Sequence, residues 1–254
     1  MRYYIWKEST HVILKISLLF LLIFIFSHQL RLILKKADIP LLRVNDIEVT
    51  GNNLVSTKKI LLLSGIRRHE NKLRLNISKA KSMIETDPFI KAVGILEKDN
   101  VFHITVSERR PFVFLKTDTD TAVLDKEGVV LKTGALLTDY DLPVLSGIEH
   151  DIFYSEGDKV TDTTVLLGLE WFNAIPINFW SQISELDIQN LRKIIIYTLD
   201  GTMIFVDNIP SFTKKFEFFY TKLLELKENI YRIDYFDLRS EQEDIIYKQY
   251  DRGN

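Results

Sequence analysis

The sequence contains no cysteine, and this absence removes several classes of protein at once. A disulfide-stabilised fold, a thiol nucleophile and a zinc site with cysteine ligands all require that residue. None of the histidines has a spacing typical of metal ligands. They are His11, His28, His69, His103 and His150. The sequence therefore predicts no metal site and no bound cofactor.

Motifs for catalysis are missing as well. There is no Gly-x-Ser-x-Gly elbow, no glycine loop that cradles phosphate, and no Ser or Thr with an identifiable base. Asp118 and Asp120 have the spacing of a pair that holds a divalent cation, but such a run between strands is typical of a solvated turn. We therefore expect a protein that is not an enzyme. A membrane-anchored cell-wall enzyme is the less favoured alternative.

One long apolar run is present near the start of the chain. From Ile16 to Leu30 there is no formal charge, and the run is too uniformly apolar for a soluble helix. Because Lys15 and Arg31 can snorkel, residues 12–34 form a helix of about 34 Å, enough to span a bilayer. A cleavable signal peptide is the alternative, but no Ala-x-Ala site follows, which favours an uncleaved anchor.

The flanking charges do not decide the orientation of this anchor. Three basic residues precede it or begin it, and three end it, so the positive-inside rule is nearly balanced. They are Arg2, Lys7 and Lys15, then Arg31, Lys35 and Lys36. Because about two hundred residues follow the helix, we expect residues 1–11 to be a short cytoplasmic tail and the remainder to be extracytoplasmic.

The remainder of the chain is acidic on average. Residues up to Lys36 carry +5, so the rest carries about −7 of the stated net charge of −2. Such an ectodomain is a poor partner for nucleic acid or anionic lipid. Its function is therefore expected to depend on recognition of other proteins.

The first part of the ectodomain predicts the order β-α-α-β-β. An alternating strand ends at Gly51, whose φ we expect to be positive, and a helix follows between the N-cap Ser56 and Gly65. A second helix in "NISKAKSMIETDPFI" stops at Asp87-Pro88. Two strands joined at Asp99-Asn100 complete the unit, with Phe102, Ile104 and Val106 on one face, and Pro111 closes it.

The second part is expected to mix hairpins and helices. Residues 122–131 predict a hairpin with a turn at 126–128, and residues 142–147 a loop. A capped helix in 161–175, strands in 184–188 and 192–206 with a turn at Asp200-Gly201, and a helix in 211–230 follow. Its apolar face comprises Phe212, Phe216, Phe219, Leu223 and Leu226. Strands near 231–239 and 244–249 end this part.

These features, in this order after one membrane helix, resemble the FtsQ family of bacterial cell-division proteins, called DivIB in Gram-positive bacteria. In the first unit the resemblance rests on Val49, Gly51, Asn52, Ser56, Pro88, Phe89, Ile90, Lys91, Ala92, Val93, Glu108, Arg109 and Pro111. Of these, Gly51, Asn52, Pro88, Glu108, Arg109 and Pro111 are expected to be structural. In the second unit it rests on "AVLDKEGVVL" and "LPVLSG". The family usually has a proline near the first hairpin tip, where this chain has Asp99-Asn100.

The resemblance implies an α+β fold with a single N-terminal transmembrane helix at 12–34. A β-α-α-β-β POTRA domain is expected at 42–111, a mixed α+β "β-domain" at 112–250, and a tail at 251–254. It also implies a non-enzymatic bitopic scaffold of the divisome in the inner membrane at the septum. This scaffold would link FtsB and FtsL type proteins to other division proteins and help to regulate septal peptidoglycan synthesis. An FtsK type protein is a further possible partner, through the POTRA and transmembrane regions.

The partner site is expected at the last strand. A strand with no neighbour on one side has an open edge, to which an extended segment can add through main-chain hydrogen bonds. Matching to the family and the strand pattern together give the partner-binding residues Arg192, Arg239, Ser240, Gln242, Ile245, Ile246, Tyr247 and Lys248. Ser240 replaces an aromatic residue that the family often has there. An envelope assembly or secretion component with a POTRA domain is the alternative, although the chain lacks the long alternating strands of a β-barrel.

Overall fold

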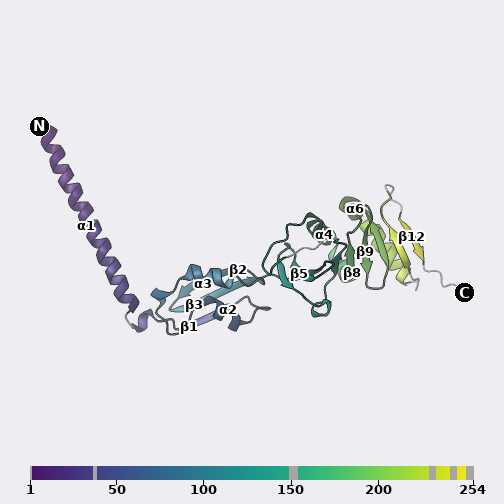
Figure 1. The fold of residues 1–254 in the computed structure, drawn as a ribbon, viewed down its shortest axis with the longest axis horizontal. Coiled ribbons are helices and arrows are strands. Elements are labelled where there is room, and N and C mark those ends of the chain that lie inside the picture. Colours follow the sequence, from purple (N-terminus) through teal and green to yellow (C-terminus); the bar gives the residue numbers. More distant parts are fainter. Residues whose placement is uncertain (1, 37–38, 149–153, 229–232, 241–244, 250–254) are drawn as a thin grey trace. The chain divides into compact units, whose positions relative to one another are not determined.

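The computed structural model describes residues 2–36, 39–148, 154–228, 233–240 and 245–249, with side chains from Leu14 onward (Figure 1). The predicted tail at 251–254 lies outside these residues. The chain forms two compact units. The first comprises Met1–Thr86 and Ile90–Glu108, and the second comprises Asp87–Phe89 and Arg109–Asn254.

The first unit begins with the long helix α1 (Arg2–Lys36). Its segment Leu14–Lys36 is, within the described part of the chain, the one helix long and apolar enough to cross a membrane. Side chains such as Phe20, Phe24 and Phe26 lie exposed, as expected for a surface that faces lipid. The helix extends beyond the predicted span at both ends. Among the described residues, this helix is consistent with a single membrane span.

The globular part of the first unit has the predicted order β-α-α-β-β. It consists of β1 (Asp46–Thr50), α2 (Thr57–Ser64), α3 (Ile77–Ile84), β2 (Ile90–Lys98) and β3 (Val101–Glu108), with short 3-10 turns η1 (Pro40–Leu42) and η2 (Lys72–Arg74). The three strands form a sheet in the order β1-β3-β2, in which β1 runs parallel to β3 and β2 antiparallel. We call this part the POTRA module.

Local sequence signals set the element boundaries of the POTRA module. The Ser56 hydroxyl accepts a hydrogen bond from the Lys59 amide, and Gly65 ends α2 with a φ of 64°. Asp99 and Asn100 both have positive φ, as a two-residue hairpin turn requires. The predicted caps and turn are confirmed. So is the shared face of β3, since Phe102, Ile104 and Val106 are all buried.

The described residues of the second unit form nine strands and three α-helices. The strands are β4 (Pro111–Lys116), β5 (Thr121–Asp125), β6 (Val130–Thr133), β7 (Val144–Ser146), β8 (Ile183–Asp187), β9 (Ile194–Thr198), β10 (Met203–Val206), β11 (Ile233–Asp237) and β12 (Ile246–Gln249). The helices are α4 (Thr163–Ala174), α5 (Ile177–Trp180) and α6 (Ile209–Glu228), with a 3-10 turn η3 (Leu137–Asp139). We call this unit the C-terminal module.

All nine strands belong to one sheet with the order β12-β11-β10-β9-β8-β7-β4-β5-β6. The neighbours β10 and β11 are parallel, so the chain must cross over between them, and α6 makes that crossover. In the same way α4 and α5 lie between the parallel strands β7 and β8. The crossovers explain why a sheet with many antiparallel pairs also carries packed helices.

The helices bury one face of the sheet in a single large core. Trp171 and Phe172 of α4, Phe179 of α5 and the apolar face of α6 pack there against strands from β4 to β11. The predicted apolar face of α6 is confirmed, because all five of its named side chains are buried. Aromatic rings meet edge to face in this core, for example Phe179 and Phe219 at 5.6 Å between centroids.

Two strands differ from the sequence prediction. Residues 142–147 are not simply a loop, because Val144–Ser146 forms β7 in the middle of the sheet. Pro111 does not only close the POTRA unit but begins β4, which the sequence reading missed. Both strands are short, bury residues on both faces and pair with strands distant in sequence, so neither shows a two-residue alternation.

Candidate functional site

The last described strand, β12, lies at an edge of the nine-stranded sheet (Figure 1). It pairs with β11 on one side in antiparallel register, with Tyr247 opposite Phe236 and Ile246 opposite Asp237. Among the described residues no strand pairs with its other side. Its outer row of backbone N–H and C=O groups can therefore pair with an added strand.

Side chains of β12 alternate between the two faces of the sheet. The ring of Tyr247 lies 5.7 Å from that of Phe236, which in turn packs edge to face on Phe219 of α6 at 5.1 Å. Ile246 and Lys248 neighbour Tyr247 and therefore point to the opposite face. Ile246 is 56% exposed, an unusual value for an isoleucine in a strand. An added strand would find apolar side chains on both faces of this edge.

On the sheet face opposite α6, cations surround the ring of Phe205. The Lys193 ammonium lies 4.4 Å from the centroid of this ring, and the Arg239 guanidinium carbon lies 5.6 Å from it. Arg239 also donates two hydrogen bonds to Asp237, at 2.9 and 2.6 Å. Because of these hydrogen bonds, the pKa of the Asp237 carboxyl lies below its usual value. These contacts hold the charges of Lys193, Arg239 and Asp237 in fixed positions on the same side of the sheet as the exposed Ile246.

A buried lysine holds the segment between β11 and β12. Lys215 of α6 is 6% exposed, and its ammonium donates hydrogen bonds to the carbonyl oxygens of Leu238, at 2.9 Å, and Ser240. A buried ammonium is costly unless such acceptors satisfy it. The contact therefore fixes the backbone that leaves β11 and leads toward β12.

Of the other predicted partner residues, Ser240 and Ile245 lie next to this edge, whereas Arg192 precedes β9, three strands from β12. Arg192 is exposed in the turn before β9, beside Lys193, and its amide donates to Asn190. Ser240 contributes its carbonyl to the contact with Lys215. Ile245 precedes β12 and packs in part against the large core, so it is less exposed than Ile246. Gln242 lies outside the described residues.

Sequence reasoning missed Lys193, Phe205 and Lys215. For Lys215 a signal was present, because it lies three residues after Phe212 and four before Phe219, on the apolar face of α6. No local pattern predicts the group around Phe205, since Lys193 precedes β9, Phe205 lies in β10 and Arg239 follows β11, and only the pairing of these strands brings them together.

The residues predicted to be structural in the POTRA module meet at the loop between β1 and α2. Gly51 has a φ of 85°, and a Cβ there would lie 2.1 Å from the carbonyl oxygen of Val106. The side-chain amide of Asn52 donates to Val55 O at 3.0 Å and Thr57 Oγ1 at 3.1 Å. Glu108, at the end of β3, accepts from the backbone amides of this loop. These are Asn53, Leu54 and Val55, at 2.8 to 2.9 Å.

The remaining structural predictions fall in the C-terminal module. Arg109 donates to Asp125 at 2.8 Å and to Glu127 at 3.1 Å, and Asp125 is almost fully buried. Asp125 in turn accepts from the amides of the turn between β5 and β6. Pro88 lies in the segment Asp87–Phe89 that belongs to this unit. Glu108 and Arg109 are thus adjacent in sequence, but Glu108 anchors a loop of the POTRA module and Arg109 anchors a turn of the C-terminal module.

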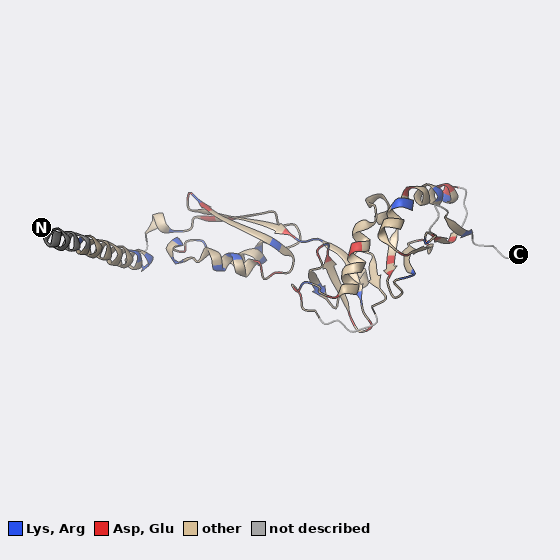
Figure 2. Cartoon of the chain, turned by 90° about the horizontal axis from the view of Figure 1, so that it is seen from above, with Lys and Arg blue, Asp and Glu red and all other residues tan. Residues whose placement is uncertain are grey.

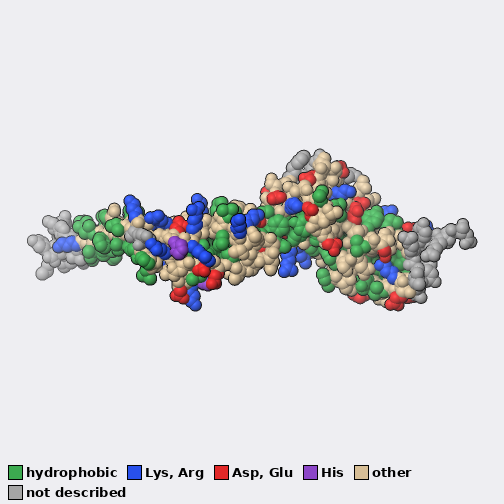
Figure 3. All heavy atoms as spheres, turned by 90° about the horizontal axis from the view of Figure 1, so that it is seen from below, with side chains coloured by type: hydrophobic (Ala, Val, Ile, Leu, Met, Phe, Trp, Pro, Cys, Tyr) green, Lys and Arg blue, Asp and Glu red, His purple; other side chains and the backbone are tan. Residues whose placement is uncertain are grey.

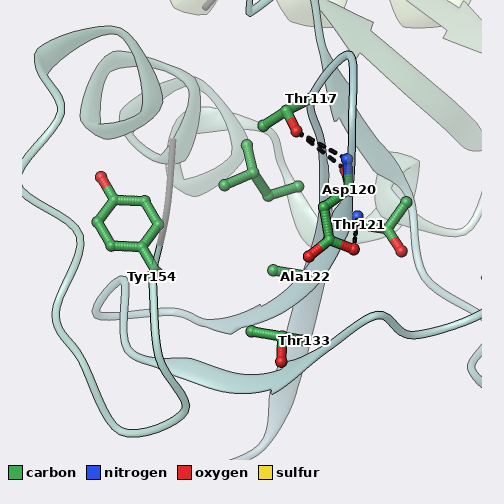
Figure 4. A pocket seen from close by; sticks show the side chains of 7 residues that line it. Thr117, Asp120, Thr121, Ala122, Thr133 and Tyr154 are labelled. Atoms are coloured by element: carbon green, nitrogen blue, oxygen red, sulfur yellow. Dashed lines mark hydrogen bonds between the residues drawn. The ribbon is translucent and has the colours of Figure 1, made fainter. Parts of the chain in front are cut away.

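Metal-ligand groups and hollows can be compared with those of known small-molecule sites. The described part of the chain contains no group of three or more His, Asp or Glu side chains that could hold a metal ion. A hollow lined by Thr117, Asp120 and Tyr154 among others has a volume of about 50 Å³ (Figure 4). A second hollow, lined by Asp118 and Gln189 among others, has a volume of about 240 Å³, and both are smaller than ligand sites of about 300 Å³ or more. In the first hollow Asp120 accepts from the Thr121 amide, and its own amide donates to Thr117 Oγ1, as in a tight turn.

Comparison with known proteins gives the same family for both modules. A family model described as POTRA domain, FtsQ-type, matches residues 42–109. A second, described as cell division protein FtsQ/DivIB, C-terminal, matches residues 113–239, half of the chain.

Individual relatives carry the corresponding names. The cell division protein DivIB of Clostridium botulinum (strain Hall) is 30% identical over 195 residues, which cover 75% of this chain and 74% of that protein. DivIB of Clostridium acetobutylicum is 32% identical over 111 residues, 43% of this chain and 45% of that relative, so this match spans less than half of the relative's length. A solved structure of the major extracytoplasmic domain of DivIB from Geobacillus stearothermophilus is 20% identical and covers 48% of this chain and 98% of that chain, with a TM-score of 0.30. The family models and the Clostridium botulinum relative together show that the chain belongs to the FtsQ/DivIB family of cell division proteins.

Proposed function

We propose that this family member is a non-enzymatic scaffold of the division machinery that captures an extended segment of an FtsB or FtsL type protein on β12. The anchor α1 would hold it in the plasma membrane at the septum, with the N-terminus in the cytoplasm and both modules outside. Joining that pair to other division proteins, including an FtsK type protein through the POTRA and transmembrane regions, would help to regulate septal peptidoglycan synthesis.

The observation that carries this proposal is the free edge of β12. Main-chain pairing needs an unpaired strand edge that is already in place, and β12 has one side paired with β11 and one side free among the described residues. The Lys215 contacts support a rigid edge, because they fix the backbone just before it. A rigid edge costs less ordering entropy when a partner adds.

Exposed groups beside the edge supply side-chain selectivity in this proposal. Ile246 and Tyr247 present apolar surface on opposite faces, and Lys248 lies 3.5 Å from Asp234 at the rim. The predicted partner residues Arg192 and Arg239 would act together with Lys193 at the sheet end that holds Phe205. A partner segment with alternating apolar residues and an acidic flank fits this pattern.

A proline scan of β12 tests the proposal. Successive backbone N–H groups of a strand point alternately outward and inward, so the variants Ile246→Pro, Tyr247→Pro and Lys248→Pro should not behave alike. Loss of an outward N–H should weaken binding and leave the melting temperature unchanged. Loss of an inward N–H should lower the melting temperature, because a ladder bond to β11 goes with it.

The measurements are co-purification of each full-length variant with the FtsB–FtsL type pair and thermal melting. Lys132→Pro in β6, the strand at the opposite edge of the sheet, is the matched control and should leave partner binding intact. If all three β12 variants retain the partner as well as the parent does, addition at this edge is wrong.

A further inference from the structure

The charge of the chain is unevenly divided between its modules. Residues 42–108 carry eleven Lys and Arg against eight Asp and Glu, a net +3, whereas residues 109–254 carry sixteen against twenty-five, a net −9. The expectation that the whole ectodomain repels anionic lipid came from an average over both modules. Figure 2 shows basic positions on the helices of the POTRA module, and Figure 3 shows basic side chains clustered on the part of the chain that follows the apolar helix.

Part of this basic surface lies where the chain enters the POTRA module. Val44 donates its amide to Glu70 O at 2.9 Å and accepts from the His69 amide at 2.8 Å. The connector 67–74 therefore lies beside the entry point. Only seven residues separate Lys36 from Val44, so this end of the module stays within about 28 Å of the end of α1.

The connector also contacts the end of α1 directly. The side-chain amide of Asn71 donates hydrogen bonds to the carbonyl oxygens of Leu34, at 2.9 Å, and Lys35, at 3.3 Å. Arg74 Nε donates to Lys35 O at 2.6 Å. The last carbonyls of a helix lack partners within the helix and carry partial negative charge, so both donors are suited to that position. These contacts place the Arg74 guanidinium beside the C-terminal end of the candidate membrane span Leu14–Lys36.

We propose that this end of the POTRA module binds the phosphate groups of anionic phospholipids. The site is a basic collar made of Arg31, Lys35 and Lys36 at the end of α1 and Arg67, Arg68 and Arg74 on the connector. The three connector residues and Lys36 are exposed. The anionic headgroups of the membrane that α1 crosses are the phosphates closest to this collar, and each Lys or Arg near such a surface contributes about 1 kcal/mol.

Two alternatives explain the collar less well. Basic residues near a membrane helix often set its topology, but here both flanks of α1 carry three, so the collar adds no topological signal. The second alternative is that nearby acidic residues neutralise the collar, but they do so only in part. Asp46 pairs with Arg68 at 2.6 Å and Glu70 lies nearby, but Arg68 remains 62% exposed in its side chain.

The test uses the full-length chain in nanodiscs of phosphatidylcholine alone or with about 30% phosphatidylglycerol. Because the sequence has no cysteine, Ser78→Cys at the exposed start of α3 gives a unique site for a bimane fluorophore. A small fraction of lipid with a nitroxide headgroup quenches the fluorophore when the module rests on the membrane. We expect stronger quenching in the anionic nanodiscs, reversed by about 0.5 M NaCl.

The triple variant Arg67→Gln, Arg68→Gln, Arg74→Gln should lower the docked-to-free ratio by about fivefold per charge removed. The matched control removes three charges from the opposite end of the module, as Lys58→Gln, Lys59→Gln, Lys91→Gln, and should keep the parent's quenching. If the triple variant does not melt like the parent, Arg67→Gln alone provides the comparison.

Three results would overturn the proposal. Equal quenching of the parent in neutral and anionic nanodiscs would exclude a preference for anionic lipid. Equal losses in the collar and control variants would show a response to net charge alone. Release by about 10 mM inorganic phosphate at constant ionic strength would identify a site for free anions instead. None of these readouts involves β12, so the outcome is independent of the proposed partner capture.

Discussion

Gly51 ends β1 in a conformation that side chains rarely adopt and in a space that they cannot enter. Gly65 provides a matched comparison, because its φ is also positive but a Cβ there would meet no atom within 4 Å. We expect Gly65→Ala to cost about 1 kcal/mol of unfolding free energy, from backbone strain alone. Gly51→Ala should cost about 3 kcal/mol or more, since the Val106 carbonyl must also move. Urea unfolding of the full chain in detergent measures both, and equal costs would contradict the close contact.

Lys215 allows a second test at the scale of one residue. Lys215→Met keeps the length of the side chain but removes the donors to Leu238 and Ser240, so amide hydrogen exchange in β12 should become faster. Partner binding should weaken with it. The neighbouring Lys214 is exposed, and Lys214→Met is the control for the loss of one lysine charge from α6. Unchanged exchange in β12 of the Lys215 variant would mean that this lysine does not hold the edge.

At the scale of elements, an ion pair joins the end of α6 to the β9–β10 hairpin. Burial alone would raise the pKa of Asp200, but hydrogen bonds from Lys227, Thr198 and Thr202 outweigh it and hold the pKa well below its usual value. A carboxyl whose pKa is lower in the folded than in the unfolded protein stabilises the fold at pH values above its unfolded pKa of about 3.9. This contribution is lost as the pH falls through the folded pKa.

Asp200→Asn should therefore reduce the unfolding free energy at pH 7 by about 1 kcal/mol, a modest value because the pair is partly exposed. It should also flatten the loss of stability between about pH 4 and pH 2. Asp118→Asn, in an exposed turn, is the control. Melting temperatures measured across this range decide the question, and identical pH profiles for Asp200→Asn and the parent would contradict the prediction.

Elements also differ in how far the sequence predicts them. The boundaries of α2 and the β2–β3 hairpin follow from residues that act locally, such as Ser56 and Asn100, so they could be predicted. The strands β4 and β7 depend on parallel pairing with distant segments and are buried on both faces, so no local pattern marks them. The same reason applies to the partner edge. Its strand could be predicted, whereas the residues of other strands beside it could not.

At the scale of the whole molecule, each module has its own packed interior, so the two should unfold separately. Trp171 and Trp180 lie in the C-terminal module, and the third tryptophan, Trp6, lies in α1. In a Trp6→Phe background, tryptophan fluorescence therefore reports the C-terminal module alone, while circular dichroism reports both. Gly51→Ala should lower the melting temperature of the circular dichroism transition that belongs to the POTRA module. The melting temperature seen by fluorescence should stay unchanged. A matching shift in both signals would show that the modules unfold as one.

The place of β12 in the chain has a consequence for biosynthesis. Every other described strand precedes β12 in sequence, so a chain that emerges from its N-terminus completes the rest of the sheet before this edge exists. During synthesis β11 therefore occupies the temporary edge of the sheet. A chain interrupted before Ile246 would retain its anchor, its POTRA module and eight strands, but it would lack the edge proposed for the partner. In the proposed scaffold, competence to recruit a partner would thus mark a chain that has been translated at least as far as β12.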